Sequence, residues 1–475
     1  MENTKKSIFE VEKLKLSNYI VNRKVDSNKI IVFSTRSCKS LILNMELFQL
    51  LESRHLSGID NSLLNDLIYK KILVEESENE LGKIISENKD HVKNKEGHNG
   101  YLYEVLQPSA MCQLGCYYCG QKHRKESVND DVVDQIINRI YKKYQSHSYK
   151  GIYLAWFGAE PLMAFNQMKI IYDRLKNLVD DPTVPIQSKI VTNGLSLKPK
   201  IYKELVNKLN VIHIEVTIDG TEEYHDSHRY LKSGNPSFKI IYQNILDIIK
   251  SEYWSPRRCK LTIRCNVDEK NYEGVVPLIY KLAQDQIQDK ITTLYFVNVF
   301  SWAQNEAHKN ALTKEMFALK EIEWNLLKHK LGYQNSFILP ERKLNTCIAT
   351  TEDSEMYDVD GNVFNCTEVS YTDVYKNSKY DLGSIINPRN IPKPHNDWWD
   401  EVENTKKYPC HTCKLLPVCG GSCPKRWTEG EIACPPSKYN LDKKLEIIYK
   451  LGNQNLDIIE LINEELDLKD FCRIE

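Results

Sequence analysis

The sequence predicts an α/β fold in which parallel strands and helices alternate, as an open partial barrel or a doubly wound sheet. Amphipathic stretches over 131–145, 165–179 and 235–250 lie between short runs rich in β-branched and aromatic residues. Those runs are YLYEVLQP, GIYLAWFG, SKIVTNG, VIHIEVTIDG, KLTIRCNV and TTLYFVNVF. Such alternation is typical of βαβ units, and six repeats are too few for a complete eight-stranded barrel.

Residues 1–95 are expected to form a small unit before this domain. NKIIVFSTRSCKSLILN predicts two short strands around a polar turn, and helical patterns follow in MELFQLLES and NSLLNDLIYKKILV. Residues 77–100 are polar and charged, which predicts a linker. The barrel or sheet domain then extends over residues 96–330.

Two further segments follow the α/β domain. Residues 331–435 carry many cysteines and few apolar runs, so we expect metal to stabilise them. Residues 436–475 are expected to form a helical tail, because LEIIYKLGNQNLDIIELINEEL carries an apolar stripe that would pack on the body.

Composition excludes some partners. The chain has 475 residues, enough for two or three domains, and its formal net charge of −1 predicts no nucleic-acid partner. It lacks the apolar run of about 18 residues that a membrane span requires. MENTKKSIFEVEKLKL has no secretion-signal pattern, so we expect a cytoplasmic protein without a membrane partner.

Fourteen cysteines in a reducing compartment indicate metal sites rather than disulfides. Ten lie in two groups. The scattered ones are expected to be small buried apolar residues, and these are Cys38, Cys259, Cys265 and Cys472.

The first group is SAMCQLGCYYCGQKH, which contains Cys112, Cys116 and Cys119. Thiolates favour zinc or iron–sulfur, and His123 leaves a Cys₃His zinc site open. The C-x₃-C-x₂-C spacing with Tyr118 before the last cysteine resembles the signature of the radical S-adenosylmethionine (SAM) enzymes. The resemblance implies a 4Fe–4S cluster on the three cysteines, with SAM on the fourth iron and a 5′-deoxyadenosyl radical as the reactive species.

That resemblance also favours a partial (β/α)₆ barrel, with chemistry at the carboxyl ends of its strands. FGAEP resembles the family's G-G-E-P, which implies SAM contacts from Gly158 and Glu160. Ala159 replaces the second glycine; its methyl group would fit if the backbone φ is negative there, and otherwise the loop would shift.

Three later stretches resemble further SAM-contacting motifs of the family. TNG, TIDG and YHDSHR imply ribose or carboxylate contacts from Asn193, Thr217 and Arg229, in addition to Tyr118. Arg264 is an alternative to Arg229.

The second cysteine group resembles the seven-cysteine SPASM domain of radical SAM enzymes that modify peptides. The resemblance implies two auxiliary 4Fe–4S clusters, and therefore three clusters in all. The outer cluster would bind Cys410, Cys413, Cys419 and Cys434, and the inner cluster Cys347, Cys366 and Cys423. The inner cluster lacks a fourth thiolate, for which Glu341 is a weak substitute. A zinc ribbon on Cys410, Cys413, Cys419 and Cys423 is the alternative.

Residues 1–95 resemble a winged-helix precursor-recognition element, which could capture a leader peptide by β-augmentation. The alternative is a packing extension that shields the barrel mouth. The combined resemblance predicts an oxidoreductase that abstracts hydrogen from a ribosomally synthesised precursor peptide and installs a thioether or carbon–carbon cross-link. A flavodoxin- or ferredoxin-type protein would donate electrons.

Other functions stay open. A sulfatase maturase would carry an aspartate base after the cysteine that matches Cys366, where this chain has Thr367. Peptide epimerisation would need a hydrogen donor, for which Cys265 is a candidate. An iron–sulfur electron carrier or a structural zinc protein is the non-enzymatic alternative. The sequence identifies no catalytic acid or base.

Overall fold

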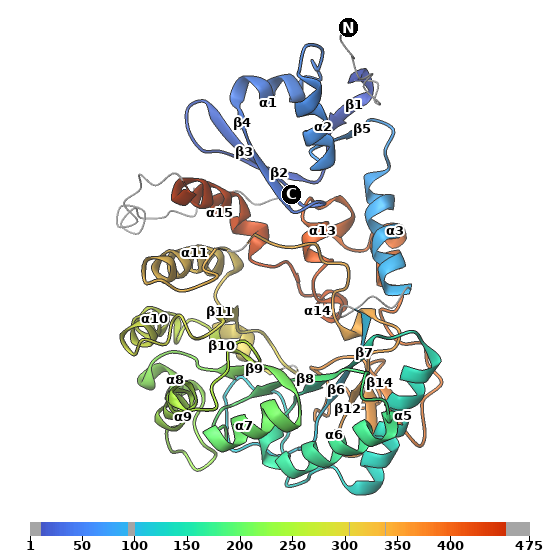
Figure 1. The fold of residues 1–475 in the computed structure, drawn as a ribbon, viewed down its shortest axis with the longest axis vertical. Coiled ribbons are helices and arrows are strands. Elements are labelled where there is room, and N and C mark those ends of the chain that lie inside the picture. Colours follow the sequence, from blue (N-terminus) through green and yellow to red (C-terminus); the bar gives the residue numbers. More distant parts are fainter. Residues whose placement is uncertain (1–10, 94–99, 304, 338, 453–475) are drawn as a thin grey trace.

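Six parallel strands form the centre of the molecule in chain order (Figure 1). They are β6 (Tyr101–Leu106), β7 (Gly151–Trp156), β8 (Ile186–Thr192), β9 (Val211–Thr217), β10 (Lys260–Val267) and β11 (Thr293–Asn298). A doubly wound sheet would reverse its strand order at a switch point, and this sheet does not. The predicted partial barrel is therefore confirmed. The structure is a computed structural model that describes residues 11–93, 100–303, 305–337 and 339–452.

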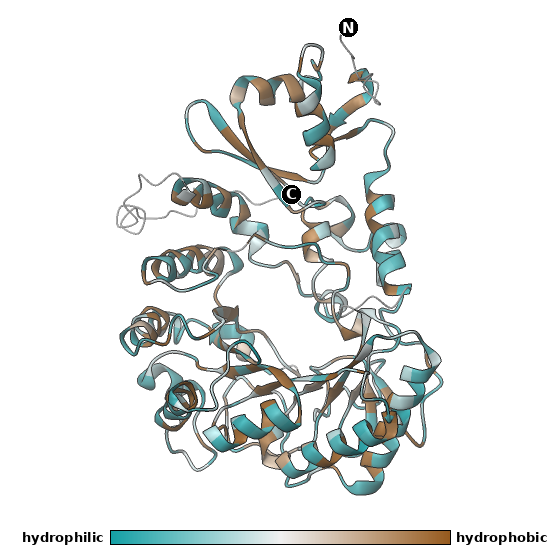
Figure 2. Ribbon diagram, viewed as in Figure 1, coloured by the Kyte–Doolittle hydropathy of each residue, from teal (hydrophilic) through white to brown (hydrophobic). Residues whose placement is uncertain are grey.

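Helices cover the outside of this sheet and pack on one large apolar core. They are α5 (Asp130–Ser146), α6 (Phe165–Val179), α7 (Pro199–Lys208), α8 (Glu222–His228), α9 (Phe238–Lys250), α10 (Val275–Gln284) and α11 (Lys314–Lys330). The side chain of Asn129 caps α5 by accepting from Val132 N, and the buried stripe of α5 includes Val133, Ile136 and Ile140. Figure 2 shows hydrophobic and hydrophilic residues sharing these helices. Short 3₁₀ helices lie at Pro161–Ala164, Tyr272–Gly274 and Ala307–Asn310.

The cysteine-rich segment extends the barrel sheet, which the sequence did not predict. β12 (Met356–Tyr357) pairs in parallel with β6, and β13 (Asn362–Phe364) and β14 (Asp381–Ser384) follow in antiparallel pairing. Gly361 makes the turn between β12 and β13 at a φ of +75°.

Short helices complete this segment. They are Ile348–Thr350, α12 (Trp398–Asp400), the π turn Glu401–Thr405, Pro409–Thr412, α13 (Leu416–Cys419) and α14 (Pro424–Thr428). The expected tail begins as α15 (Ser437–Gly452), which packs against α11 and β2. Residues 453–475, with Cys472, lie outside the described part. Of the other scattered cysteines, Cys259 and Cys265 are buried and Cys38 is half-buried.

The N-terminal unit lies at the top of Figure 1 and has two small sheets. β1 (Leu14–Leu16) pairs with β5 (Leu73–Glu75), and β2 (Ile20–Lys24), β3 (Lys29–Ser34) and β4 (Lys39–Asn44) form an antiparallel sheet. The helical parts are Val11–Lys13, α1 (Met45–Glu52) and α2 (Asn61–Tyr69). The predicted hairpin and helices are present, and one face of the larger sheet packs on α1 and α2.

The expected linker over 77–100 is wrong for most of its length, because α3 (Glu80–Lys93) is a helix. Ile84 and Ile85 on α3 pack against Trp398 and Trp399 in one buried cluster. The polar composition that indicated a linker reflects the exposed side of this helix.

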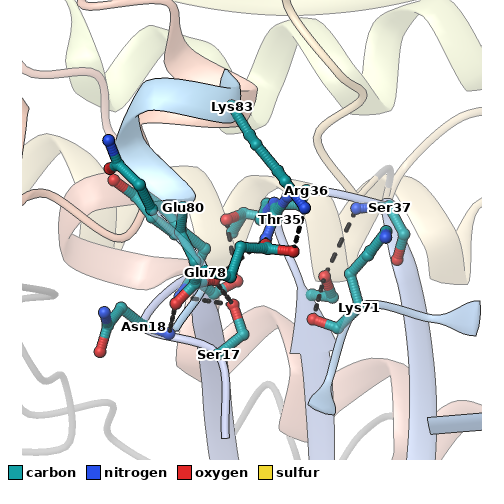
Figure 3. A network of polar contacts seen from close by, with 12 residues as sticks. Ser17, Asn18, Thr35, Arg36, Ser37, Lys71, Glu78, Glu80 and Lys83 are labelled. Carbon is teal, nitrogen blue, oxygen red and sulfur yellow. Dashed lines mark hydrogen bonds and ion pairs between the residues drawn. The ribbon is translucent and has the colours of Figure 1, made fainter. Parts of the chain in front are cut away.

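A buried polar network fixes the N-terminal unit to the start of α3 (Figure 3). The Arg36 guanidinium donates to Glu78 at 2.5 Å and to Glu80 at 3.1 Å. Glu80 also accepts from the Ser17 hydroxyl and from Asn18 N. Pairing and hydrogen bonding offset part of the free-energy cost of removing these charges from water. The network therefore holds the unit in one arrangement at moderate cost.

The second face of the three-stranded sheet packs on the cysteine-rich segment. Val21, Ile31 and Phe33 share an apolar cluster with Leu415, Val418, Leu441 and Leu445. The Thr35 hydroxyl donates to the backbone oxygen of Lys414 at 2.6 Å. The N-terminal unit therefore rests on the loop that connects Cys413 and Cys419. Within the described ranges, no helix is long and apolar enough to cross a bilayer.

Candidate functional site

The loop after β6 brings Cys112, Cys116 and Cys119 together. Each of these thiols is affected electrostatically by one of the other two, and all three line the same cavity, so they share one neighbourhood. Burial is the main cause that raises the pKa of Cys112 and of Cys116 to about 11. Three crowded thiols of raised pKa suit a strongly cationic group, which would stabilise them as thiolates.

A cavity of about 170 Å³ opens beside these cysteines at the carboxyl ends of the strands. Five of the six residues expected to contact SAM line it, namely Tyr118, Gly158, Asn193, Thr217 and Arg229. The position matches the rule that reactive centres of parallel α/β folds lie at this edge. The three thiols and the residues that line the cavity therefore fit, by their chemistry and position, an iron–sulfur cluster with an adjacent nucleotide.

The backbone after β7 is tightly constrained. A Cβ atom at Gly158, whose φ is +75°, would lie 2.0 Å from Gln107 Nε2, so only glycine fits there. Ala159 has a φ of +45°, so the negative φ that would accommodate its methyl group without strain is not adopted here. The Gln121 side chain holds this strained residue by accepting from Ala159 N at 2.9 Å.

Glu160, the sixth expected residue, is fully buried behind this loop. Its carboxylate accepts from Leu162 N at 3.0 Å, from the Thr192 hydroxyl at 2.7 Å and from Asn193 N at 2.7 Å. Burial raises its pKa, and these hydrogen bonds oppose the shift. Glu160 thus links the end of β7 to the end of β8.

Arg229 and Tyr118 contact each other rather than extending separately into the cavity. Arg229 Nη1 donates to the Tyr118 hydroxyl at 2.6 Å, and that hydroxyl donates to Asp219 Oδ2 at 2.6 Å. Asn266 Nδ2 donates to the same hydroxyl at 2.9 Å. Sequence reasoning did not single out Asp219, although it lies in the TIDG motif, or Asn266, the penultimate residue of β10 and two residues after Arg264.

Arg264 is half-exposed and lines the cavity, with Nε donating to Asn266 Oδ1 at 2.8 Å. Because side chains alternate along a strand, Cys265 points the opposite way, into the apolar core between sheet and helices. Cys265 is fully buried there, so its candidacy as an inward-facing hydrogen donor is wrong.

Glu368 was also missed by sequence reasoning, because it lies beyond the strands of the barrel. Glu368 lines the cavity, and its backbone oxygen accepts from Trp302 Nε1 at 2.7 Å. Burial is the main cause that raises the pKa of Glu368, and Lys425 and Arg264 oppose the shift.

His123, the alternative zinc ligand, also lines the cavity. Burial, assisted by the charge of Lys232, lowers its pKa to about 4, so it is neutral at physiological pH. In the described part of the chain, no three His, Cys, Asp or Glu side chains converge at single-ion distance.

The second cysteine group divides into two neighbourhoods. One neighbourhood contains Cys347, Cys366 and Cys423, whose thiols interact electrostatically. The charge of Glu368 also raises the pKa of Cys366. Burial raises the pKa of Cys347 to about 11, although this residue faces an opening to solvent. Glu341 is exposed and its charge acts on Cys38.

The remaining thiols line a cavity of about 260 Å³, and these are Cys410, Cys413, Cys419 and Cys434. The other three thiols raise the pKa of Cys410 further, after burial as the main cause. Lys438 Nζ donates to Cys413 Sγ at 3.3 Å. This division into three and four thiols is the one that the SPASM resemblance implies.

Residues 106–263 match the family model described as the radical SAM superfamily. They extend from the end of β6 into β10 and include the first cysteine loop. This part of the chain is therefore similar to radical SAM domains, a family that implies a 4Fe–4S cluster and SAM.

Two curated relatives share parts of the chain. The radical SAM cyclopropyl synthase TigE of Paramaledivibacter caminithermalis is 27% identical over 266 residues, which cover 50% of this chain and 54% of TigE. The serine-type anaerobic sulfatase-maturating enzyme of Bacteroides thetaiotaomicron is 30% identical over 151 residues, covering 30% of this chain and 36% of that enzyme. The chain thus spans about half of the first relative's length and about a third of the second's.

A solved structure has a similar fold over a longer range. Native anSMEcpe with bound AdoMet superposes with a TM-score of 0.51 at 18% identity, covering 76% of this chain and 99% of that one. This likeness establishes the fold and leaves the substrate open.

Proposed function

We propose that this protein is a radical SAM enzyme that oxidatively cross-links a ribosomally synthesised peptide. One observation carries the proposal: three mutually close thiols border a cavity at the carboxyl ends of the strands. An electron carrier or a structural zinc protein would have no use for the cavity beside its cysteines, where the half-exposed Arg264 retains hydrogen-bond donors.

Cys112, Cys116 and Cys119 would hold the SAM-binding 4Fe–4S cluster, which supplies the electron that splits SAM into methionine and a 5′-deoxyadenosyl radical. Asn193, Thr217 and the backbone at Gly158 are positioned to hold the nucleotide. Glu160 would support this site by fixing Asn193 N.

The seven later cysteines would hold two auxiliary clusters. Forming a bond from a substrate radical releases one electron and one proton. The inner set of thiols (Cys347, Cys366 and Cys423) lies closer to the cavity than the outer set does, through Glu368. An auxiliary cluster is therefore the proposed electron acceptor. Iron equivalent to three clusters per chain supports this assignment, and iron for one cluster contradicts it.

Among the described residues, β2 is the edge of its sheet and pairs only with β3, so its outer side could receive an extended peptide. Tyr19 O and Val25 N bond to β3, so the alternate residues Ile20, Asn22 and Lys24 direct their backbone groups outward. Two grooves of about 680 and 640 Å³ follow this edge and share Ile20, Asn22 and Lys414. Main-chain pairing along such an edge is the physical basis of β-augmentation. The packing alternative has support too, because both faces of this sheet are covered.

Relatives support a peptide substrate without identifying it. The structure of native anSMEcpe with bound AdoMet and Cp18Cys peptide has the same fold as this chain, with a TM-score of 0.50. The name of TigE denotes formation of a carbon–carbon ring. Formylglycine formation is less favoured, because Thr367 replaces the aspartate base of the sulfatase maturases.

Two experiments test the proposal in sequence. Reduced, anaerobically reconstituted protein should convert SAM to 5′-deoxyadenosine, and none from a fully loaded sample would favour the electron carrier. Co-expression with a short peptide encoded beside this gene should then give a product lighter by two hydrogens. An unchanged mass with inverted stereochemistry would indicate epimerisation instead.

Peptide capture has a matched pair of variants. Asn22→Pro removes an outward N–H at an edge position that tolerates proline, whereas Asn22→Ala retains it. Only the proline variant should lose peptide affinity, and both should still cleave SAM. Equal affinity in the two variants would contradict capture at β2.

A further inference from the structure

The Arg229 guanidinium is fixed in an unusual place. Arg229 is 7% exposed, and its Nε has no hydrogen-bond partner in the described part of the chain. Burial would lower its pKa, yet the nearby Cys116, Tyr118 and Asp219 keep that pKa well above its usual value. Two backbone hydrogen bonds place this permanent positive charge beside Cys116. Gly115 N donates to Tyr230 O at 2.9 Å, and Tyr117 N donates to His228 O at 3.3 Å.

The hydrogen bonds around Tyr118 orient the Arg229 guanidinium. The Tyr118 hydroxyl accepts from Arg229 Nη1 and is itself held by Asp219 and Asn266. Asp219 is fixed in turn, because Oδ1 accepts from Asn266 N at 2.8 Å. The backbone of Arg229 is anchored as well, with Arg229 N donating to His225 O at 2.7 Å.

We propose that Arg229 is a positioning residue that raises the reduction potential of the SAM-binding cluster, with its charge held behind Cys116 by the Tyr118 hydroxyl. This inference rests on the proposed function, and it differs from the SAM-carboxylate contact that the family resemblance implies for Arg229. Reduction adds one electron from an external donor to the cluster and moves no proton. A buried cation stabilises the more negative, reduced state, because a low dielectric strengthens the attraction.

Arg264 provides a matched control. It lines the same cavity, but its charge acts on Glu215, Tyr295 and Glu368. It is half-exposed and keeps donors available for a ligand carboxylate. A change at Arg264 should therefore affect nucleotide affinity, and a change at Arg229 should affect the cluster potential.

The experiment is a potentiometric titration of the full chain, followed by electron paramagnetic resonance. The signal that shifts when SAM is added identifies the relevant cluster. In Arg229→Gln, the ratio of reduced to oxidised cluster at a fixed potential should fall about tenfold, which equals a midpoint about 59 mV lower for one electron. Arg264→Gln should keep the midpoint and weaken the SAM-induced shift.

Two further variants separate charge from structure. In Arg229→Lys, the midpoint potential of the SAM-binding cluster should stay close to that of the parent. Tyr118→Phe should lower this midpoint less than Arg229→Gln does, because only the orienting hydroxyl is lost. Iron content, measured in every variant, shows that the cluster is present. An unchanged midpoint in Arg229→Gln, or an equal fall in Arg264→Gln, would overturn the inference. A parent protein without a SAM-responsive signal would refute the proposed function itself.

Discussion

Phe33 lies where the N-terminal unit meets the cysteine-rich segment, and its removal should destabilise both. Phe33 has no exposed surface and packs with Val21, Leu415 and Val418. Truncating a buried phenylalanine to alanine typically costs about 3–5 kcal/mol, from lost apolar burial and the cavity left behind. Since a whole domain is stable by only about 5–15 kcal/mol, Phe33→Ala should noticeably loosen the loop that carries Cys413 and Cys419.

The assay combines denaturant unfolding with the rate at which a chelator removes iron. Phe33→Ala should lower the unfolding midpoint and release the iron of the outer set faster than the parent does. Ile42→Ala on β4 is the control, because Ile42 is 48% exposed and its loss should change stability by at most about 0.5 kcal/mol. Unchanged iron release in Phe33→Ala, or the same loss in both variants, would refute the packing argument. The same contact predicts that deleting residues 1–95 also loosens the outer set, beyond any effect on peptide binding.

Three further predictions follow. Ala159→Gly should stabilise the protein by about 0.4–1 kcal/mol, because glycine tolerates a φ of +45°; a lower thermal midpoint would contradict this. Cys112→Ala should abolish 5′-deoxyadenosine formation and lose one cluster's iron, while Cys259→Ala, in the core, should keep both; equal iron in the two would count against the ligand assignment. Burial, chiefly, raises the pKa of Glu104 from 4.5 to about 7, so the folded state holds a proton that the unfolded state releases. Stability should therefore fall as pH rises from about 4.5 to 7, and Glu104→Gln should flatten that part of the pH profile in denaturant titrations.

The barrel was predictable because its strands follow a local rule. Runs such as GIYLAWFG and KLTIRCNV combine β-branched and aromatic residues, and each corresponds to an observed strand. The strands β12 to β14 escaped prediction because each has only two to four residues and depends on the edge of β6. Helix α3 escaped because its apolar contacts, Trp398 and Trp399, lie more than 300 residues away in sequence.

The site shows the same division. Cysteine spacing could predict the three groups of thiols. The ligands of one iron–sulfur cluster either lie close together along the chain or follow a spacing typical of a family. It could not predict that Ala159 has a positive φ, which the hydrogen bond from Ala159 N to Gln121 supports. Nor could it predict that Arg229 faces Tyr118, because that contact depends on how the loop after β6 packs on the end of α8.

The contacts also show the spatial order of the three thiol groups, from the cavity to the N-terminal unit. The inner set reaches the cavity through Glu368, and the loop from Cys419 to Cys423 joins it to the outer set. The outer set contacts the N-terminal unit, because the Thr35 hydroxyl donates to the backbone oxygen of Lys414, the residue after Cys413. A peptide captured along β2 would therefore bind on the far side of the auxiliary sites from the cavity. Under the proposed function, its reactive residues must lie well separated in sequence from the captured segment, because the chain between them has to pass the cysteine-rich segment to reach the radical.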